Sequence, residues 1–525
     1  MGLSSISRIC GEGPCPMTTA RTWAIALSGL DGSLVEVEAD LSNQQPEFRI
    51  IGLPDKALGE AVQRVHNASA NCGLELPRRR LTVNLSPASV PKHGSAFDVA
   101  IAIAALATEG RMDAASIAQT VHIGELGLDG RLRPVPGVLP AVIAAAREGI
   151  GRVIVPHANA PEASLVEGID VIGAVSLADV ARFHGADVED RPLDPVPAPA
   201  TVGQERPIAD LAEVIGQRDA VEALIAAAAG GHHMLMSGPP GAGKTMLASR
   251  LPGILPELDD AAALEVAAIR SLAGDSIGSL QRRPPLEAPH HSASIASLVG
   301  GGSRVVRPGA IARATHGILF LDEVGEFAPS VLDALRQPLE TGTITIHRAG
   351  VTASFPASFQ LMLATNPCPC GNHGVRGGSC VCPPMAIRRY LGRLSGPLLD
   401  RVDIELGLAR VSVANAADLT ADIVTTDAAA ARVAEARARA ARRLRATPWR
   451  VNARVSGPWL RDGPLALPPV VRRPIDAALH RGSLTLRGYD RVLRVAWTLS
   501  DLAARPSPTV HDIGRALFMK KGITT

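Results

Sequence analysis

The sequence predicts a multidomain α/β protein with three folded parts. These are an α+β N-terminal domain over 17–190, a parallel-sheet domain over 208–411 and a helical C-terminal domain over 412–525. A chain of 525 residues is long enough for three to four domains of about 150 residues. Prolines favour extended backbone, and five of them mark 191–207 as a linker: Pro192, Pro195, Pro197, Pro199 and Pro207. The order of strands and helices differs on the two sides of this linker.

Composition sets the first limits on function. Hydrophobic residues make up 46% and charged residues 20%, so the chain has enough apolar residues for large cores and is not disordered. Aromatic residues are only 3%, which argues against binding single strands mainly by stacking. The net charge of +2 excludes a histone-like binder. Only five basic residues are lysines, so the role of each lysine is worth asking about.

Targeting signals are not evident. The longest apolar run, Phe97 to Ala107, is interrupted by Asp98 and is much shorter than the roughly 20 residues that cross a bilayer. Residues 1–16 lack the apolar stretch of a secretory signal, and seven cysteines are too few for a disulfide framework. We expect a cytoplasmic protein.

The elements follow in order along the chain. Before the linker, alternating strands at 33–39 and 81–85 mix with alanine-rich helical segments at 57–69, 99–107 and 139–148, an α+β pattern. After it, apolar strands at 234–236, 318–321 and 360–364 are separated by helices, as in a parallel sheet. Beyond about Val411 the pattern is helical.

The first of these apolar strands is followed by a phosphate-binding loop. The motif GxxxxGK[ST] is matched by Gly238, Pro239, Pro240, Gly241, Ala242, Gly243, Lys244 and Thr245. Glycines let backbone amides converge on phosphate oxygens, the lysine reaches the β- and γ-phosphates, and the hydroxyl supplies a ligand to Mg²⁺. The motif predicts ATP and Mg²⁺ as cofactors.

Two further strands end in polar residues. Asp322 and Glu323 follow the strand 318–321, where the first would hold Mg²⁺ and the second would polarise the attacking water. Asn366 follows the strand 360–364 and is expected to orient that water. Asparagine before proline is also an ordinary turn signal, so Asn366 alone is a weak indication.

Taken together, these motifs resemble a known family. The P-loop, Leu321-Asp322-Glu323, Asn366 and Leu398-Leu399-Asp400-Arg401 are similar to those of AAA+ ATPases of the magnesium-chelatase branch. The resemblance implies that Arg401 reaches the γ-phosphate of the neighbouring subunit, so that the site is complete only in a ring. It also implies a sensor arginine acting within its own subunit, which we place at Arg487, with Arg491 as the second choice.

Other strings narrow the resemblance to the ComM/YifB-type magnesium-chelatase-like family: Ile50 to Asp55, Pro77 to Ala88 and Pro289 to Ser294. It covers about residues 18–520. Family members begin near Met17, so residues 1–16 are expected to be either a mis-assigned start or a disordered extension. The family implies a homohexamer that hydrolyses ATP and acts on DNA as a branch-migration helicase in recombination and natural transformation. The alternative is a magnesium-chelatase-type ATPase subunit that drives metal insertion. Glu287 replaces an arginine of the family pattern, which puts a basic contact there in doubt.

The N-terminal block also resembles the proteolytic domain of Lon, through Ile123 to Leu126 and Gly137 to Ile150. Aligned with that pattern, Ala96 takes the place of the nucleophilic serine and Ala141 that of the lysine base. Ser95 lies one residue away, but Lys92 in the same segment is a poor partner for it. We expect a protease-like fold without the catalytic dyad.

Four cysteines lie within fifteen residues: Cys368, Cys370, Cys380 and Cys382. Two close pairs of thiolates suit tetrahedral Zn²⁺. A reversible disulfide or free thiols are the alternatives. The neighbouring pairs His232-His233 and His290-His291 are poor metal sites, because adjacent side chains point apart, and we expect polar structural contacts from both.

Two segments are candidates for contact with DNA. Residues 343–355 alternate and turn at Ala349-Gly350, which predicts a β-hairpin with His347 and Arg348 near its tip. In related ring ATPases such a hairpin faces the pore, so these two residues are candidate DNA contacts; a solvated hairpin is the alternative. The run from Arg432 to Arg454 holds eight arginines, which would either bind phosphate or form a solvated face.

Overall fold

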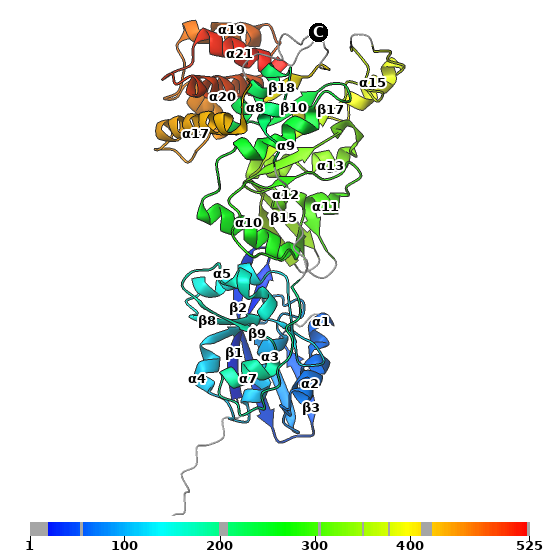
Figure 1. The fold of residues 1–525 in the computed structure, drawn as a ribbon, viewed down its shortest axis with the longest axis vertical. Helices are drawn as coiled ribbons and strands as arrows, with labels where there is room; N and C mark the ends of the chain where they lie inside the picture. The colour runs from blue at the N-terminus through cyan, green and yellow to red at the C-terminus, as the bar shows by residue number, and fades with distance from the viewer. Residues whose placement is uncertain are drawn as a thin grey trace, which may run out of the picture. The chain divides into compact units, whose positions relative to one another are not determined.

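The computed structural model describes residues 19–52, 56–198, 208–302, 306–348, 351–375, 378–410 and 423–521 (Figure 1). These residues form two compact units. The first contains the N-terminal segment and 270–279, and the second contains most of the remaining chain. In the described parts, every helix is too short or too polar to cross a membrane. The proposed extension 1–16 and linker residues 199–207 lie outside the described residues.

The first unit is built on a seven-stranded mixed sheet. Its strand order is β3-β4-β2-β1-β5-β8-β9. The pairs β1–β2 and β2–β4 are antiparallel, and the remaining pairs are parallel. The strands are β1 (Thr19–Ser28), β2 (Asp31–Ser42), β3 (Glu47–Ile51), β4 (Arg80–Ser86), β5 (Thr120–His122), β8 (Arg152–Pro156) and β9 (Asp170–Ala174).

Helices cover both faces of this sheet. Because side chains alternate along a strand, Ala24 and Ala26 of β1 face a core that also contains α3 (Asp98–Ala107), whose residues are all buried. On the other face α5 (Val138–Arg147) packs so closely that a Cβ at Gly32 would overlap Ala144. The expected helix at 57–69 is interrupted at Glu60 between α1 (Lys56–Gly59) and α2 (Ala61–Asn71). Shorter elements are α4 (Ala114–Ala118), β6 (Glu125–Leu126), β7 (Leu132–Arg133), α6 (Ala160–Ala163) and α7 (Leu177–Phe183).

The second unit has the predicted parallel sheet. Its order is β11-β14-β17-β10-β18, and all four neighbouring pairs are parallel. The strands are β10 (Met234–Ser237), β11 (Leu286–Glu287), β14 (Ile318–Leu321), β17 (Gln360–Thr365) and β18 (Ile404–Gly407). β14 and β17 are entirely buried, which explains their continuous apolar sequences. The carboxyl ends of β10, β14 and β17 therefore lie along one edge of the sheet.

Helices of the C-terminal part share one hydrophobic cluster with this sheet. The larger helices of the unit are α8 (Arg218–Gly230), α9 (Lys244–Ile254), α10 (Asp260–Ala273), α17 (Thr426–Arg443), α19 (Pro469–His480), α20 (Leu486–Leu502) and α21 (Val510–Lys521). Its shorter elements include α11 (Ile295–Val299), β12 (Gly300–Gly301), β13 (Arg307–Pro308), α12 (Ala310–Arg313), α13 (Pro329–Asp333), α14 (Arg336–Thr341), α15 (Pro384–Leu391), α16 (Gly396–Leu399) and α18 (Gly457–Arg461). The helical pattern predicted for this part is confirmed.

The arginine-rich run lies on and after α17, and its arginines largely serve the fold. Arg432 makes two hydrogen bonds of 2.8 Å to Glu222. Arg437 donates to Ala228 O at 3.0 and 2.7 Å, and burial lowers its pKa to about 10. Arg443 pairs with Asp501 and stacks on Trp497. These three arginines have partners on helices distant in the sequence, and phosphate binding by the run stays a prediction.

Candidate nucleotide site

The phosphate-binding loop joins β10 to α9. Gly241 and Gly243 have φ angles of 78° and 85°, a left-handed conformation that glycine adopts without strain. Gly238 packs against Leu408, the residue that follows β18: a Cβ added to Gly238 would lie 2.5 Å from Leu408 O. The loop thus has the backbone shape that a phosphate cradle requires, at the N-terminus of an eleven-residue helix.

Lys244 is 8% exposed and lies inside this loop. Its Nζ donates to Gly238 O at 2.6 Å, to Pro239 O at 3.1 Å and to Asn366 Oδ1 at 3.0 Å. Burial lowers the pKa of Lys244, while the carboxylates of Asp322 and Glu323 act in the opposite direction. The structure therefore brings the lysine and asparagine together although they are 122 residues apart.

The two residues expected to hold Mg²⁺ are in direct contact. Thr245 Oγ1 donates to Asp322 Oδ2 at 2.6 Å. Neighbouring ligands of an octahedral Mg²⁺ ion are about 2.9 Å apart, given bonds of 2.0–2.1 Å. A hydroxyl and a carboxylate at this spacing fit that ion with little movement.

Glu323 has an unusual backbone. Its φ of 49° and ψ of 46° are left-handed, which is uncommon for a residue other than glycine and marks local strain. Its half-exposed carboxylate lies 3.4 Å from His291 Nδ1, and the ring of His290 lies 4.0 Å from that of His291. The polar contact predicted for the histidine pair is present, but its partner, the proposed water-polarising glutamate, was not predicted.

The candidate finger Arg401 and the candidate sensor Arg487 are far apart in the sequence, and the fold brings them close together. Arg401 Nη1 donates to Pro397 O at 2.5 Å, and Nη2 pairs with Glu340. Burial, with repulsion from Arg487, lowers the pKa of Arg401. Arg487, on the first turn of α20, is 69% exposed and lies 3.5 Å from Asp400 Oδ2. Arg491, the second choice, is occupied by the buried carboxylate of Asp403, so Arg487 is the accessible arginine of the two.

Another basic residue reaches the phosphate-binding loop. Arg410 Nε donates to Pro240 O at 3.2 Å, from the segment that follows β18. Nothing in the local sequence indicated this contact, because it depends on how β18 runs beside β10. The contact brings a guanidinium to the backbone of the loop.

The four cysteines converge as predicted. The Sγ distances are 3.4 Å for Cys368–Cys370, 3.8 Å for Cys368–Cys380 and 3.7 Å for Cys370–Cys380, and all four sulfurs lie within 4.8 Å of one another. Sulfurs bound tetrahedrally to zinc at 2.3 Å are about 3.8 Å apart, so the set fits that ion. A backbone amide and Cys368 lower the pKa of Cys370 to about 6.

The expected hairpin is formed by β15 (Thr343–Arg348) and β16 (Val351–Pro356). His347 is exposed, and its Nδ1 lies 3.3 Å from Thr352 Oγ1 across the hairpin. Arg348 ends β15; its side chain and the turn at 349–350 lie outside the described residues. The hairpin itself is confirmed, and the DNA contacts stay a prediction.

In the N-terminal unit, Lys92 and Ser95 have different hydrogen-bond partners. Lys92 is buried, and its Nζ donates to Gly52 O at 3.1 Å, to Leu85 O at 3.0 Å and to Pro87 O. Ser95 donates instead to Glu125. Lys92 thus contacts carbonyl oxygens and Ser95 a carboxylate, and the missing Ser–Lys dyad stays an expectation from the sequence.

A P-loop over a parallel sheet, with Asp322 and Asn366 beside it, defines a P-loop nucleotide-binding protein. Three family models match: magnesium chelatase, subunit ChlI, over 210–416; subunit ChlI of Mg-chelatase over 37–159; and magnesium chelatase, subunit ChlI C-terminal, over 424–520.

Full-length relatives agree with these models. An uncharacterized protein of Mycobacterium tuberculosis is 48% identical over 96% of this chain and 99% of its own length. Competence protein ComM of Haemophilus influenzae is 40% identical over 93% and 94%, and the uncharacterized protein YifB of Escherichia coli is 38% identical over 91% and 92%. The chain belongs to the ComM/YifB-type magnesium-chelatase-like family and is an ATPase of the AAA+ class, a family in which ATP and Mg²⁺ are the cofactors.

Proposed function

We propose that the protein is a ring-shaped motor, a homohexamer, that hydrolyses ATP and drives branch migration of DNA in recombination and natural transformation. The observation that carries this proposal is the pairing of Lys244 with Asn366 and of Thr245 with Asp322 at the carboxyl ends of the parallel strands. In the same unit the candidate finger Arg401 pairs with Glu340. Similarity to a competence protein over almost the whole chain supports the DNA substrate.

In this proposal the catalytic residues have separate roles. Lys244 binds the β- and γ-phosphates, Thr245 and Asp322 hold Mg²⁺, Glu323 polarises the attacking water, and Asn366 orients it. Mg²⁺ would neutralise phosphate charge when bound. Arg401 acts on the nucleotide of the neighbouring subunit, and Arg487 acts on that of its own.

The remaining parts serve the substrate. The hairpin β15–β16, with His347 and Arg348, contacts DNA in the pore. The four cysteines hold a structural zinc ion, a proposal that their spacing supports. A Lon-like domain over 17–190 without a dyad assembles or guides DNA, ahead of an ATPase core over 208–411 and a lid over 412–525.

The test measures ATP turnover with and without single-stranded or forked DNA, together with displacement of a labelled branch. We expect stimulation and displacement, and Lys244→Ala should abolish both. Arg401→Ala should lower turnover by about 10³-fold. Absence of stimulation and of displacement would reject the motor, and full turnover by a monomer would reject the shared site.

A second candidate is a magnesium-chelatase-type ATPase subunit that drives metal insertion, which the chelatase family models favour over three segments. The four-cysteine cluster is not expected of such a subunit. Binding of the protein to a purified porphyrin-chelating partner, with ATP turnover stimulated by that partner and not by DNA, would select this function instead.

A further inference from the structure

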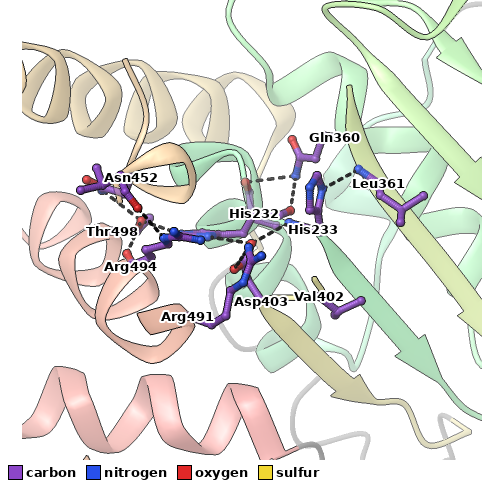
Figure 2. Close-up of polar contacts among 12 residues, drawn as sticks. His232, His233, Gln360, Leu361, Val402, Asp403, Asn452, Arg491, Arg494 and Thr498 are labelled. Carbon is purple, nitrogen blue, oxygen red and sulfur yellow. Dashed lines mark hydrogen bonds and ion pairs between the residues drawn. The ribbon is translucent and has the colours of Figure 1, made fainter. Parts of the chain in front are cut away.

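A buried polar cluster lies where β10, β17, β18 and α20 meet (Figure 2). We call it the Asp403 cluster; its members are His232, His233, Asp403, Asn452, Arg491 and Thr498. Asp403, His232 and Thr498 are each fully buried. Charged and polar groups at such depth are costly unless they are paired, so the geometry of their pairing matters.

Asp403 is the centre of the cluster. It accepts a hydrogen bond from Arg491 Nη1 at 2.9 Å and one from the backbone N–H of His233 at 3.1 Å. Its own N–H donates to His233 O at 3.0 Å. Burial alone would raise the pKa of Asp403, but Arg491 and the contact with His232 hold it far below the ordinary value, so the group is a carboxylate.

His232 connects this carboxylate to the lid helix. Its Nδ1 lies 3.4 Å from Asp403 Oδ2, and its Nε2 lies 2.7 Å from Thr498 Oγ1 (Figure 2). A carboxylate only accepts, so a proton on Nδ1 suits this contact. Asn452 Nδ2 donates to Thr498 Oγ1 at 3.1 Å, which ties the same hydroxyl to a second segment of the C-terminal part.

The other histidine joins the cluster to the catalytic strands. His233 Nδ1 accepts from Leu361 N on β17 at 2.9 Å, and burial lowers the pKa of His233 to about 3, so it is neutral. Gln360 Nε2 donates to His232 O at 2.8 Å. β17, which leads to Asn366, and β10, which leads to Lys244, are therefore both connected to Asp403 through His232 and His233.

The candidate finger Arg401 and the candidate sensor Arg487 are close in sequence to members of the Asp403 cluster. Arg401 is two residues before Asp403, and Arg487 is one helical turn before Arg491 on α20. We propose that Asp403 is a positioning residue that sets the finger Arg401 and couples it, through Arg491 and the His232–Thr498 contact, to the lid helix carrying Arg487. This inference rests on the proposed action of Arg401 between subunits.

The physical reason concerns how Arg401 is held: its side chain, 11% exposed, contacts Pro397 O on the four-residue helix α16 and Glu340, whose own side chain is 60% exposed. A finger must approach the γ-phosphate of the neighbouring subunit within hydrogen-bonding distance, so small displacements matter. A buried ion pair two residues away limits those displacements. It also transmits a displacement of Arg401 to α20, because Arg491 and Thr498 lie on that helix.

The experiment compares three variants of the full chain. Asp403→Asn keeps the shape of the side chain and removes its charge. Thr498→Val keeps the ion pair and removes only the hydroxyl that His232 contacts. Thr315→Val is the control for loss of a buried threonine hydroxyl, because Thr315 is equally buried and donates to Pro356 O in the same unit but outside the cluster. Thr498 Oγ1 has three polar contacts, with His232, Asn452 and Arg494 O, so the two variants are compared at equal thermal stability.

We expect Asp403→Asn to lower kcat of the assembled enzyme by about tenfold or more, while the Kd for ATP changes by less than about threefold. Thr498→Val should lower kcat measurably below that of Thr315→Val at similar thermal stability. If Asp403→Asn does not fold, the comparison of the two valine variants decides alone. A kcat for Asp403→Asn or Thr498→Val equal to that of Thr315→Val, or loss of ATP binding in parallel with kcat, would overturn the proposal.

A mixing experiment separates positioning of the finger from damage to the variant's own site. Rings assembled from Asp403→Asn and Lys244→Ala subunits contain intact ATP sites beside intact fingers, so turnover should exceed the sum of the two separate preparations. Turnover equal to that sum overturns the proposal. Arg401→Ala mixed with Lys244→Ala is the control: if that pair fails to recover turnover, the shared site of the proposed function is wrong, and not only the role of Asp403.

Discussion

The cysteine loop touches the phosphate-binding loop at one glycine, and this contact can be tested. Gly371 has a φ of 80°, and a Cβ added to it would lie 2.8 Å from Pro240 Cγ and closer still to Cδ. Pro240 is in turn held by Arg410 through its carbonyl oxygen. A methyl group at Gly371 must therefore displace either the cysteine loop or the P-loop by about 1 Å to reach ordinary contact distance.

The variant Gly371→Ala combines two costs. Left-handed backbone costs any residue with a Cβ about 1–2 kcal/mol. Displacement of the P-loop by about 1 Å would lengthen at least one amide–phosphate hydrogen bond, and hydrogen bonds to charged groups are worth about 1.5–3 kcal/mol. We therefore expect the affinity for ATP to fall by about ten- to a hundredfold.

The matched control lies three residues away in the same loop. Gly374 has a φ of 73° and nothing within 4 Å of an added Cβ, so Gly374→Ala carries the backbone cost without the contact. Binding of a fluorescent ATP analogue, with bound zinc measured on the same samples, compares the two. Equal affinities in both variants would refute the reasoning, because the cysteine loop would then yield to the methyl group and leave the P-loop in place.

Three further predictions concern stability and metal binding. Burial lowers the pKa of His122, and it lowers that of His184 to about 4. Because these histidines bind protons near pH 6.5 in the unfolded chain, the first unit should have its full stability above that pH and lose stability as the pH decreases toward 4. Denaturant midpoints that do not change with pH over this range would contradict this prediction. Ser176→Ala removes a side-chain cap and capping box of α7 and should cost about 1 kcal/mol in free energy of unfolding, whereas an unchanged urea midpoint would show that the cap contributes nothing. Cys380→Ser should abolish bound zinc, measured by elemental analysis, and retention of one zinc per chain would remove the proposed four-sulfur site.

Much of the fold follows from signals that are continuous in the sequence. The strands of the parallel sheet are short runs of apolar residues because both faces are buried, and the hairpin at 343–356 alternates because it is not. The P-loop is equally local, since its glycines are needed at the positive φ angles observed. Such features need no knowledge of which other segment lies beside them.

Contacts between distant segments could not be predicted in this way. His291 meets Glu323, and Arg410 meets Pro240, only because separate strands run side by side in a particular order. The arginines of α17 illustrate the same limit: a dense charge run suggests phosphate, but Arg437 finds the carbonyl of Ala228, 209 residues away. A local pattern states what a side chain can bind and not what the fold presents to it.

The site also explains why two structural clusters lie where they do. Asn366 follows the carboxyl end of β17 and Arg401 precedes the amino end of β18, so both lie outside the strands, and loops position catalytic groups less precisely than strands do. A residue of a structural cluster follows each of them after two positions: Cys368 of the four-sulfur cluster follows Asn366, and the buried Asp403 follows Arg401. The loop that carries the four-sulfur cluster also contacts the P-loop, so a change in it should weaken ATP binding. Asp403 contacts Arg491 of the lid helix α20, so a change at Asp403 should slow turnover while ATP binding is retained. Gly371→Ala and Asp403→Asn should therefore affect different kinetic constants, and a shared effect on both would show that the two clusters act only by stabilising the fold.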